Sequence, residues 1–330
     1  MDRPLVALVL AGGTGTRLFP ASRSDRPKQF LAFGGDESLL ARTVDRVAFA
    51  EETYVLTRER FADAIHDHAP GVGVLTEPEP KDTGPALVYA AARLREQVGD
   101  CVLLCVPSDH HVAGAFAPTA RRAAEAAVET GGLVALGVEP TRPATGYGYV
   151  EPGADRGGYR EVVRFHEKPD AETAAVYVDR GWYWNAGIFA WTPAALLREA
   201  RASPLEPLVA ALEAGDPAAG FAAVDPVSVD EAVLERTDEA FVVPAAFEWD
   251  DLGTWDALER IRDGGANVTV GDVLALDAAD NVLAAGPDAR ISAVAVDDLV
   301  VAAYDGDVLV VPKDRSQRVR EVVDELDEPR

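Results

Sequence analysis

The stretch that decides the fold lies near the start of the chain: Pro4-Leu-Val-Ala-Leu-Val-Leu10, followed at once by Ala11-Gly-Gly-Thr-Gly-Thr-Arg17. A continuous apolar run of this length predicts a buried strand, and the glycines after it let backbone N–H groups approach phosphate oxygens closely. A Walker loop would need a lysine and a hydroxyl residue directly after its last glycine, and a dinucleotide fingerprint would need a third glycine near Leu18. The loop therefore predicts a phosphate-binding turn of a different kind.

Cationic side chains gather directly after this loop. Arg17, Arg23, Arg26 and Lys28 follow the glycines in a chain that is otherwise strongly acidic, and Lys28 is one of only four lysines. Guanidinium and ammonium groups bind phosphate through charge-assisted hydrogen bonds, so the segment predicts a polyphosphate site. The plainer alternative is a tight strand-to-loop turn with exposed basic residues.

Apolar segments of strand length alternate with segments of helical periodicity through the first part of the chain. This alternation predicts an α/β fold with a mostly parallel sheet and helices on both faces. Strands are expected near 4–10, 53–56, 101–106 and 133–137, and helices near 38–47, 58–68, 85–94 and 117–129.

The character of the sequence changes after residue 263. Short valine-rich segments broken by Gly-Asp, Ala-Asp-Asn and Asp-Gly turns run from Val268 to Val311 and predict a small all-β unit, and a final helix is expected over 315–326. We expect one large α/β domain over 1–263 and a β-rich C-terminal unit with a final helix over 264–330. No internal repeat is evident in the sequence.

The net charge of −25, from 56 acidic against 31 basic residues, is the most unusual feature of the composition. So acidic a surface disfavours nucleic acids and membrane surfaces as partners. Self-repulsive charge keeps a protein soluble, and halophile surfaces use it, so we prefer a high-salt cytoplasm as the explanation. A merely acidic mesophile protein is the alternative.

Cys101 and Cys105 are the only cysteines, and both fall in the strand expected at 101–106. Four strand residues would put the sulfurs about 13 Å apart, which is too far for a disulfide. Two thiols alone also make a poor zinc site. We expect two buried thiols in a reducing cytoplasm, with no signal peptide and no apolar run long enough to span a bilayer.

The opening stretch resembles the signature of the sugar-1-phosphate nucleotidyltransferases, and Ser22-Arg23 with Lys28-Gln29-Phe30 is similar to the mannose-1-phosphate guanylyltransferases (GDP-mannose pyrophosphorylases) in particular. The resemblance covers essentially the whole chain and implies a Rossmann-like, GT-A-like nucleotidyltransferase fold. The matching segments are Leu10-Ala-Gly-Gly-Thr-Gly-Thr-Arg-Leu-Phe-Pro20, Pro27-Lys-Gln-Phe-Leu31, Val106-Pro-Ser-Asp-His110, Gly146-Tyr-Gly-Tyr149, Phe165-His-Glu-Lys-Pro169, Trp184-Asn-Ala-Gly-Ile-Phe189 and Trp249-Asp-Asp-Leu-Gly-Thr-Trp255.

The resemblance implies an enzyme that transfers GMP from GTP to α-D-mannose 1-phosphate, giving GDP-mannose and pyrophosphate. Mg²⁺ would be the cofactor, held by Asp109 and Asp251, and Asp109 follows a strand at the carboxyl end, where α/β sheets place ligands. Asp250 is the nearest rival and could lie behind Asp251, and a lone aspartate after a strand is otherwise a helix cap. The adjacent His110 and His111 would point opposite ways on an extended backbone, so we do not expect a transition-metal site there.

The same resemblance implies how the phosphates react and which cationic side chains would contact them. The phosphate oxygen of the sugar phosphate would attack the α-phosphorus of GTP in line, with no covalent intermediate and no general base, because the attacking phosphate is already anionic. Arg17 would stabilise the departing pyrophosphate, Lys28 the triphosphate and Lys168 the sugar phosphate. The implied nucleotide-binding residues of the opening stretch are Leu10, Ala11, Gly12, Gly13, Gly15, Thr16, Arg17 and Lys28.

Four positions match the sugar-phosphate-binding positions of the family: Gly148, Glu167, Lys168 and Asn185. Glutamate and asparagine can accept from and donate to sugar hydroxyls, and the glycine lets the backbone approach the ring. For Lys168 the plain alternative is a surface lysine in a loop.

The base pocket is where the sequence departs from the family pattern. The family usually has Asn-Thr-Ala-Pro-Ala where this chain has Lys81-Asp-Thr-Gly-Pro-Ala86. A carboxylate at Asp82 can accept from guanine N1–H and the exocyclic amine, so guanine contacts from Asp82, Thr83 and Pro85 are expected. A turn that caps the next helix is the alternative.

Three functions stay open on the sequence: guanylyl transfer to mannose 1-phosphate, the same chemistry with another NTP and hexose 1-phosphate, and a non-catalytic relative that binds nucleotide-sugar and regulates a partner. A regulator need keep none of Arg17, Lys28, Asp109, Lys168 and Asp251, so their presence favours an enzyme. The family is often dimeric, and a homodimer is therefore possible.

Overall fold

The computed structural model describes residues 3–13, 15–33, 35, 37–261 and 265–327, in two compact units. The first unit consists of Met1–Gly12, Val44–Pro107 and Val112–Trp249, and the second of Gly13–Thr43, Ser108–His111 and Asp250–Arg330. Three elements run across these divisions: helix α1 (Leu39–Arg46) and the paired short strands β5 (His111–Gly114) and β11 (Phe247–Asp250). The domain boundary expected at 263 and 264 falls outside the described residues, so it stays a prediction.

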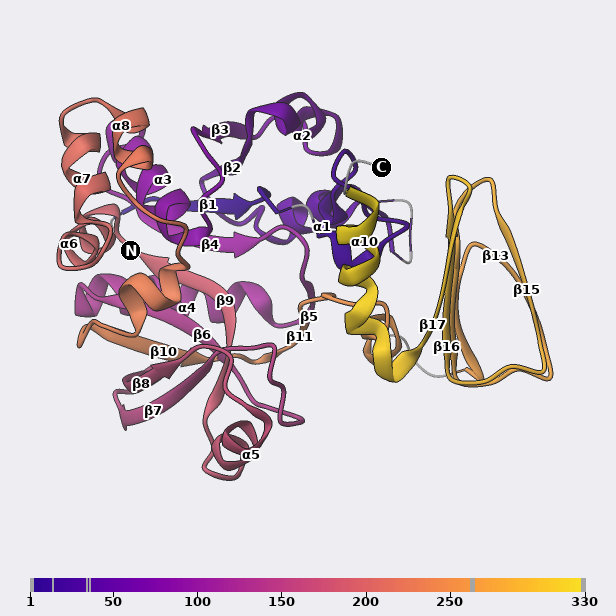
Figure 1. Cartoon of the computed structure of the whole chain (residues 1–330). Helices are drawn as coiled ribbons and strands as arrows, with labels where there is room; N and C mark the ends of the chain where they lie inside the picture. Colours follow the sequence, from indigo (N-terminus) through magenta and orange to yellow (C-terminus); the bar gives the residue numbers. More distant parts are fainter. Residues whose placement is uncertain (1–2, 14, 34, 36, 262–264, 328–330) are drawn as a thin grey trace. The chain divides into compact units, whose positions relative to one another are not determined.

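A nine-stranded mixed sheet forms the centre of the first unit, in the order β3-β2-β1-β4-β9-β6-β10-β8-β7 (Figure 1). Strands β1, β2, β3 and β4 pair in parallel, as do β6 and β10, while β9 runs antiparallel to β4 and β6. The strands are β1 (Leu5–Leu10), β2 (Glu52–Arg58), β3 (Gly73–Glu77), β4 (Val102–Pro107), β6 (Leu133–Val138), β7 (Tyr149–Asp155), β8 (Arg160–His166), β9 (Tyr183–Trp191) and β10 (Ala240–Pro244).

Helices cover both faces of this sheet, and consecutive residues of β1 from Leu5 to Val9 are all buried as a result. Val6 and Leu8 pack in one core cluster with Leu87 and Leu94 of α3, while α4 packs against β4, β6 and β9. The helices of this unit are η3 (Glu59–Phe61), α2 (Ala62–His68), α3 (Thr83–Gln97), α4 (Phe116–Thr130), α5 (Ala171–Asp179), α6 (Pro193–Arg201), α7 (Glu206–Glu213), α8 (Pro217–Ala222) and the π-helical turn η4 (Asp230–Leu234).

The register of the parallel strands brings their carboxyl ends to one edge. Leu10, the last residue of β1, lies opposite Leu56 of β2 and Pro107 of β4, and Glu77 ends β3 opposite Arg58. The glycine loop therefore begins at the edge where an α/β sheet places its ligands.

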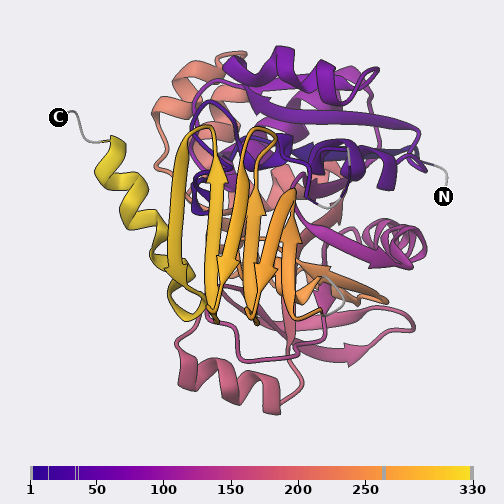
Figure 2. The same cartoon turned by 90° about the vertical axis from the view of Figure 1, so that its right-hand side faces the viewer.

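The six short strands β12 to β17 of the second unit form two sheets, β12-β14-β16-β17 and β13-β15, which Figure 1 shows edge-on as two layers and Figure 2 shows face-on. Asp272 pairs with Arg290 and Val282 with Val300, so these two pairs of parallel strands share an offset of 18 residues, whereas Asn267 of β12 pairs with Asn281 of β14 at an offset of 14. The elements are η1 (Thr16–Leu18), η2 (Lys28–Phe30), α9 (Ala257–Arg260), β12 (Asn267–Val270), β13 (Asp272–Leu276), β14 (Asn281–Ala285), β15 (Arg290–Val294), β16 (Leu299–Tyr304), β17 (Asp307–Pro312), η5 (Lys313–Arg318) and α10 (Val319–Asp327).

The segment that follows the glycine loop packs on these strands. Leu18 and Phe33 share a hydrophobic cluster with Val282 and Val300, and the indole N–H of Trp255 donates to the carbonyl oxygen of Phe19 at 2.9 Å. The β-rich part of the chain therefore supports the loop that carries the predicted phosphate-binding cations.

Most of the expected elements are confirmed, including the α/β fold, the small β unit and both buried cysteines. The sequence did not predict strand β3, which is short and only partly buried. The final helix was expected to begin at residue 315, but the structure has the 3-10 segment η5 up to Arg318 before helix α10 begins. The sequence also did not predict the 18-residue offset, because the turns share apolar periodicity but few identical residues. Within the described residues, no helix is both long and apolar enough to cross a bilayer.

Candidate functional site

The glycine loop is anchored at both of its ends. In the first unit the Ala11 N–H donates to the Leu56 carbonyl at 2.8 Å, and the Thr57 hydroxyl donates to the Ala11 carbonyl at 2.9 Å. In the second unit Gly15 has φ of +60°, and a Cβ there would lie 2.5 Å from Cβ of Lys28. Glycine is therefore required at 15 both by the backbone conformation and by the close approach of Lys28.

Lys28 is the predicted phosphate-binding residue of the second unit that contacts both segments carrying the predicted metal ligands. Its side chain is only 5% exposed, and its ammonium lies 3.0 Å from Oδ2 of Asp109 and donates to the main-chain oxygen of Asp251 at 2.6 Å. A buried ammonium needs such partners, because its desolvation is otherwise uncompensated. Residues from three separate segments, all singled out in the sequence, thus meet at one ammonium group.

Asp109 follows strand β4 and keeps its charge. Burial acts to raise the pKa of its carboxyl, but the charges of Lys28 and His110 and the hydrogen bond from Lys28 outweigh burial, so the pKa lies below its usual value. Its side chain is 30% exposed. An ionised carboxylate that still reaches solvent can accept a further cation.

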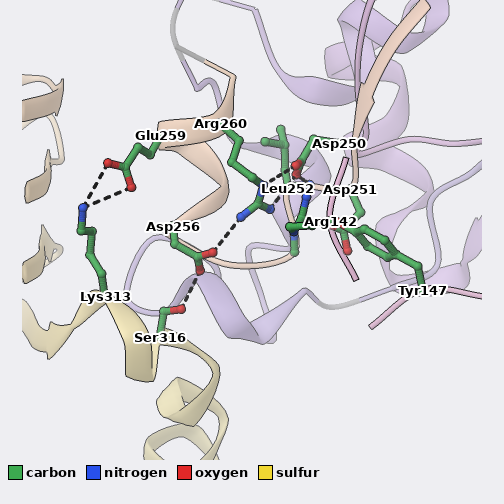
Figure 3. Close-up of polar contacts among 11 residues, drawn as sticks. Arg142, Tyr147, Asp250, Asp251, Leu252, Asp256, Glu259, Arg260, Lys313 and Ser316 are labelled. Carbon is green, nitrogen blue, oxygen red and sulfur yellow. Dashed lines mark hydrogen bonds and ion pairs between the residues drawn. The ribbon is translucent and has the colours of Figure 1, made fainter. Parts of the chain in front are cut away.

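Asp251 and Asp250 differ in what they contact (Figure 3). Asp250 is buried, accepts from Arg260 at 2.6 and 3.1 Å, and accepts the Leu252 N–H at 2.9 Å. Leu252 has φ of +48°, an unfavourable conformation for a branched side chain, and the Asp250 contact helps to hold it. Asp250 is therefore a structural support for the turn at Asp251.

The Asp251 carboxylate accepts a hydrogen bond from the Gly253 N–H at 3.0 Å, and an asparagine at 251 could accept the same bond. A Cβ at 253 would lie 2.6 Å from Oδ2 of Asp251, so glycine there leaves room for the carboxylate. The Asp250–Arg260 pair extends through Asp256 to Ser316, which the dashed lines of Figure 3 trace.

The remaining cations of the opening segment have different environments. Arg17 is exposed on η1 and can meet a ligand. Arg23 pairs with Asp307 at the start of β17 at 2.6 Å, and Arg26 pairs with Asp305 in the β16–β17 turn at 2.7 Å. The sequence reading counted all four basic residues toward a polyphosphate site, whereas these two arginines tie the segment to the C-terminal strands.

The donor chemistry of Asp109 and Asp251 fits a hard divalent cation. Both are carboxylates, which is the ligand type that Mg²⁺ prefers, and Mg²⁺ commonly takes only one or two protein carboxylates and fills the rest with water and phosphate oxygens. Within the described ranges, no group of three or more histidine, cysteine, aspartate or glutamate side chains is placed to hold a metal. A metal bound here would thus depend on phosphate oxygens for its other ligands.

The four predicted sugar-phosphate residues do come together in the first unit, and we call them the sugar-phosphate set: Gly148, Glu167, Lys168 and Asn185. The Asn185 N–H donates to the Gly148 carbonyl at 2.8 Å, and a Cβ at 148 would lie 2.4 Å from Oε2 of Glu167. Lys168 is ion-paired with Glu167 and has φ of +46°. Burial opposes the charge of the Lys168 ammonium, but Glu167 outweighs it and the pKa of Lys168 is raised.

The sequence reading missed a fifth polar residue of this region, Asp230. Asn185 Nδ2 donates to Asp230 Oδ1 at 2.8 Å. Burial, and then the charge of Glu167, raise the pKa of Asp230 to about 7. Asp230 lies 45 residues from Asn185 in sequence and in no motif that was singled out, so its only sequence signal was an acidic pair, Asp230-Glu231, before the apolar Ala-Val-Leu234.

The three predicted base-pocket residues lie at the start of α3. The Asp82 carboxylate accepts from the Thr83 N–H at 2.7 Å, and Thr83 Oγ1 accepts from the Val229 N–H at 3.0 Å. Asp82 is exposed with φ of +67°, and Pro85 is buried in the first turn. The alternative considered from sequence, a helix cap, is what Asp82 forms, and its role toward a base stays a prediction.

Glu77 is a second residue that the sequence reading missed. Its side chain is 7% exposed at the carboxyl end of β3, and a Cβ on Gly12 would lie 3.1 Å from its Oε1. Burial raises its pKa to about 7, because Arg58 at 3.9 Å lowers it only partly and Asp82 raises it further. A titratable carboxyl thus lies beside Gly12, the first glycine of the loop.

The mixed sheet with helices on both faces and the glycine loop at the carboxyl end of β1 define an α/β protein with its loop at the edge where such sheets place ligands. The chain belongs to the nucleotidyl transferase family, whose model matches residues 6–266. A MannoseP isomerase/GMP-like β-helix domain matches residues 271–326. The expectations of an enzyme of this family, with this fold and a C-terminal β unit, are confirmed.

Named relatives extend along almost the whole chain. The xanthan biosynthesis protein XanB of Xanthomonas campestris pv. campestris (strain B100) is 39% identical over 98% of this chain and 73% of its own length. A mannose-1-phosphate guanylyltransferase of Escherichia coli is 33% identical over 98% of this chain and 74% of its own length. A crystal structure described as mannose-1-phosphate geranyltransferase from Thermus thermophilus is 36% identical, with a TM-score of 0.91 over 98% of this chain and 99% of that one.

Proposed function

We propose that this protein transfers GMP from GTP to α-D-mannose 1-phosphate, giving GDP-mannose and pyrophosphate. Enzymes of its family act on a nucleoside triphosphate and a sugar phosphate, and named mannose-1-phosphate guanylyltransferases align with 98% of the chain. The observation that carries the proposal is the buried Lys28 ammonium, held by Asp109 and the main chain of Asp251 beside the glycine loop. A chain that had lost catalysis would have no reason to keep this costly arrangement.

Asp109 and Asp251 would hold Mg²⁺ through their carboxylates. A bound Mg²⁺ supplies positive charge that offsets the charge of the phosphates during transfer. The ionised state of Asp109, maintained by Lys28, and the room that Gly253 leaves around the Asp251 carboxylate support this assignment.

Lys28 and Arg17 would serve the triphosphate. Lys28 is fixed by two contacts and offers a rigid positive charge near the attacked phosphorus. Arg17 is exposed and can bind the departing pyrophosphate bidentately. The glycine N–H groups of the loop, from Gly12 to Gly15, would donate to phosphate oxygens.

The sugar-phosphate set would bind the second substrate. Lys168 would pair with its phosphate, while Glu167 and Asn185 would bind sugar hydroxyls, with Gly148 leaving space for Glu167. The attacking phosphate is already anionic, so the reaction needs positioning and charge rather than a general base.

Asp82 is the residue on which the choice of base depends. Its carboxylate accepts from Thr83 N–H with Oδ1, which leaves Oδ2 for a donor such as guanine N1–H. The same oxygen is available to other donors, so a different NTP with a different hexose 1-phosphate is the second candidate.

One panel tests the proposal. Purified protein with Mg²⁺ is mixed with each NTP and each common hexose 1-phosphate, at low and at high KCl because of the net charge of −25, and pyrophosphate is measured. We expect GTP with mannose 1-phosphate to give the highest kcat/KM. Turnover with UTP or dTTP alone would overturn the guanine assignment, and no turnover with any pair would overturn the enzyme.

Two further expectations accompany the proposal. Activity that rises with KCl would support a high-salt cytoplasm, and activity that falls would favour an ordinary acidic protein. Light scattering tests the possible homodimer.

A further inference from the structure

Asp230 is a carboxyl that the reaction described above does not use. It opens η4, a π-helical turn of a kind that is rare and recurs at functional sites. Its Oδ1 accepts from Asn185 Nδ2 at 2.8 Å, while Asn185 Oδ1 accepts from the Gly187 N–H at 3.0 Å. Both ends of the Asn185 amide therefore have partners of the correct kind, and Asp230 fixes which way the amide faces.

The charges around Asp230 are mostly negative. Glu167, whose side chain is 14% exposed, acts on it directly, and Lys168 is the cation that opposes this effect. The main-chain N–H of Glu167 is itself held by the Glu235 carboxylate at 3.0 Å. The charged groups that lie toward Asp230 or its partners from the neighbouring elements are Glu167, Lys168, Glu235 and Asp82.

In this negatively charged, buried environment it is energetically unfavourable for Glu167 and Asp230 to be ionised at the same time. The pKa of Asp230 is raised to about 7 by burial first and then by Glu167. Near neutral pH Asp230 is therefore about half protonated, and a protonated carboxyl can donate a hydrogen bond while a carboxylate accepts one.

We propose that Asp230 is a positioning and sugar-recognising residue, which fixes the Asn185 amide and, as the neutral partner of the Glu167 carboxylate, binds adjacent hydroxyls of a hexose 1-phosphate. This inference rests on the function proposed above. The protonated Asp230 donates to one sugar oxygen, and Glu167 accepts from the neighbouring hydroxyl. When Asp230 loses its proton to solvent, the donor is lost and a second negative charge faces the substrate phosphate beside Lys168.

The proposal predicts that the sugar phosphate binds with uptake of a proton above neutral pH. The KM for mannose 1-phosphate is expected to rise with pH above 7, by about tenfold per pH unit at the limit. The KM for GTP is expected to stay constant, because Asp230 has no role toward the nucleotide. Asp230→Asn keeps an acceptor for Asn185 and cannot ionise, so its KM profile is expected to be flat above pH 7. Asp230→Ala is expected to raise the KM about 3- to 10-fold at all pH values, because Asn185 loses its partner.

Glu231→Gln is the matched control. It removes one carboxylate from the exposed neighbour on the same turn, and it is expected to follow the unaltered protein. The sugar phosphate has its own ionisation near pH 6, and comparison of the unaltered protein with Asp230→Asn at each pH cancels it. Equal pH dependence of KM in these two proteins would overturn the proposal.

A calorimetric measurement on the unaltered protein tests the inference without a variant. Mannose 1-phosphate is titrated at pH 8 in two buffers of different ionisation enthalpy, and uptake of close to one proton is expected. Binding without proton uptake would overturn the role of Asp230. Binding with proton uptake but no turnover in the NTP panel would instead overturn the proposed reaction and leave the binding role intact.

Discussion

Asp251→Asn and Asp250→Asn remove the same charge from adjacent residues, and the structure predicts opposite consequences. In Asp251→Asn the main-chain oxygen that accepts from Lys28 at 2.6 Å is retained, and the new amide oxygen can still accept from Gly253 N–H. The free energy of unfolding should therefore change by less than about 1 kcal/mol. If the Asp251 carboxylate holds Mg²⁺, kcat should fall about 10²- to 10³-fold, which is about 3–4 kcal/mol of transition-state stabilisation.

Asp250→Asn should show the reverse. Its side chain is 7% exposed and faces Arg260 at 2.6 and 3.1 Å, so removing the charge deprives the guanidinium of this ion pair while its pair with Asp256 is retained. Loss of one partner of a buried pair costs about 3–5 kcal/mol, and the partial exposure of Arg260 and its second partner reduce this to about 2–3 kcal/mol. Because the turn keeps an acceptor for Leu252 N–H, kcat should fall less than about tenfold.

Denaturant unfolding followed by fluorescence gives the stability of both variants, and pyrophosphate release at saturating substrates gives kcat. A third readout is the Mg²⁺ concentration for half-maximal activity, which should rise in Asp251→Asn and not in Asp250→Asn. If Asp251→Asn keeps the unaltered kcat and Mg²⁺ dependence, the metal assignment is wrong. If both variants lose stability equally, the distinction drawn between the two carboxylates is wrong.

Two further predictions concern the glycine loop. Glu77→Gln should raise the free energy of unfolding at pH 8.5 by up to about 3 kcal/mol and leave it nearly unchanged at pH 4. The reason is that the pKa of the Glu77 carboxyl rises from 4.5 to about 7 on folding, so the unaltered protein loses stability as the pH rises through that window. Equal gains at both pH values would contradict this. Gly15→Ala should destabilise the protein by at least about 1 kcal/mol and weaken NTP binding, because its Cβ would meet Lys28 at 2.5 Å and its φ is +60°. A Cβ at Gly13 would have no atom within 4 Å, so Gly13→Ala should leave stability unchanged. Thermal unfolding and the KM for GTP would show whether the two variants differ in this way.

The sequence predicted the fold well where periodicity and turn chemistry agree. The apolar run at the start, the glycines after it and the valine-rich C-terminal segments correspond to β1, the loop and the β unit. Strand β3 was missed because only Leu75 of its five residues is buried, which gives a weak apolar signal. The 18-residue offset in the β unit was missed because packing in parallel turns needs matching size and polarity rather than matching residues.

The candidate site likewise contains residues that the sequence predicted and residues that it did not. Lys28, Asp109 and Asp251 belong to short motifs, and the structure brings them to one ammonium. Asp230 and Glu77 have no motif, and their distinctive property is burial beside other charges, which a sequence does not display. Arg23 and Arg26 look like phosphate ligands in the sequence because their partners, Asp307 and Asp305, lie far away along the chain.

The central claim is that the phosphate of mannose 1-phosphate attacks the α-phosphorus of GTP. Its most direct test uses mannose 1-phosphate with ¹⁸O in the three non-bridging phosphate oxygens, unlabelled GTP and Mg²⁺, followed by ³¹P NMR and mass spectrometry of the products. All of the label is expected in GDP-mannose, including the oxygen that joins its two phosphorus atoms, with unlabelled pyrophosphate. Label in the pyrophosphate, or the absence of GDP-mannose, would contradict the account.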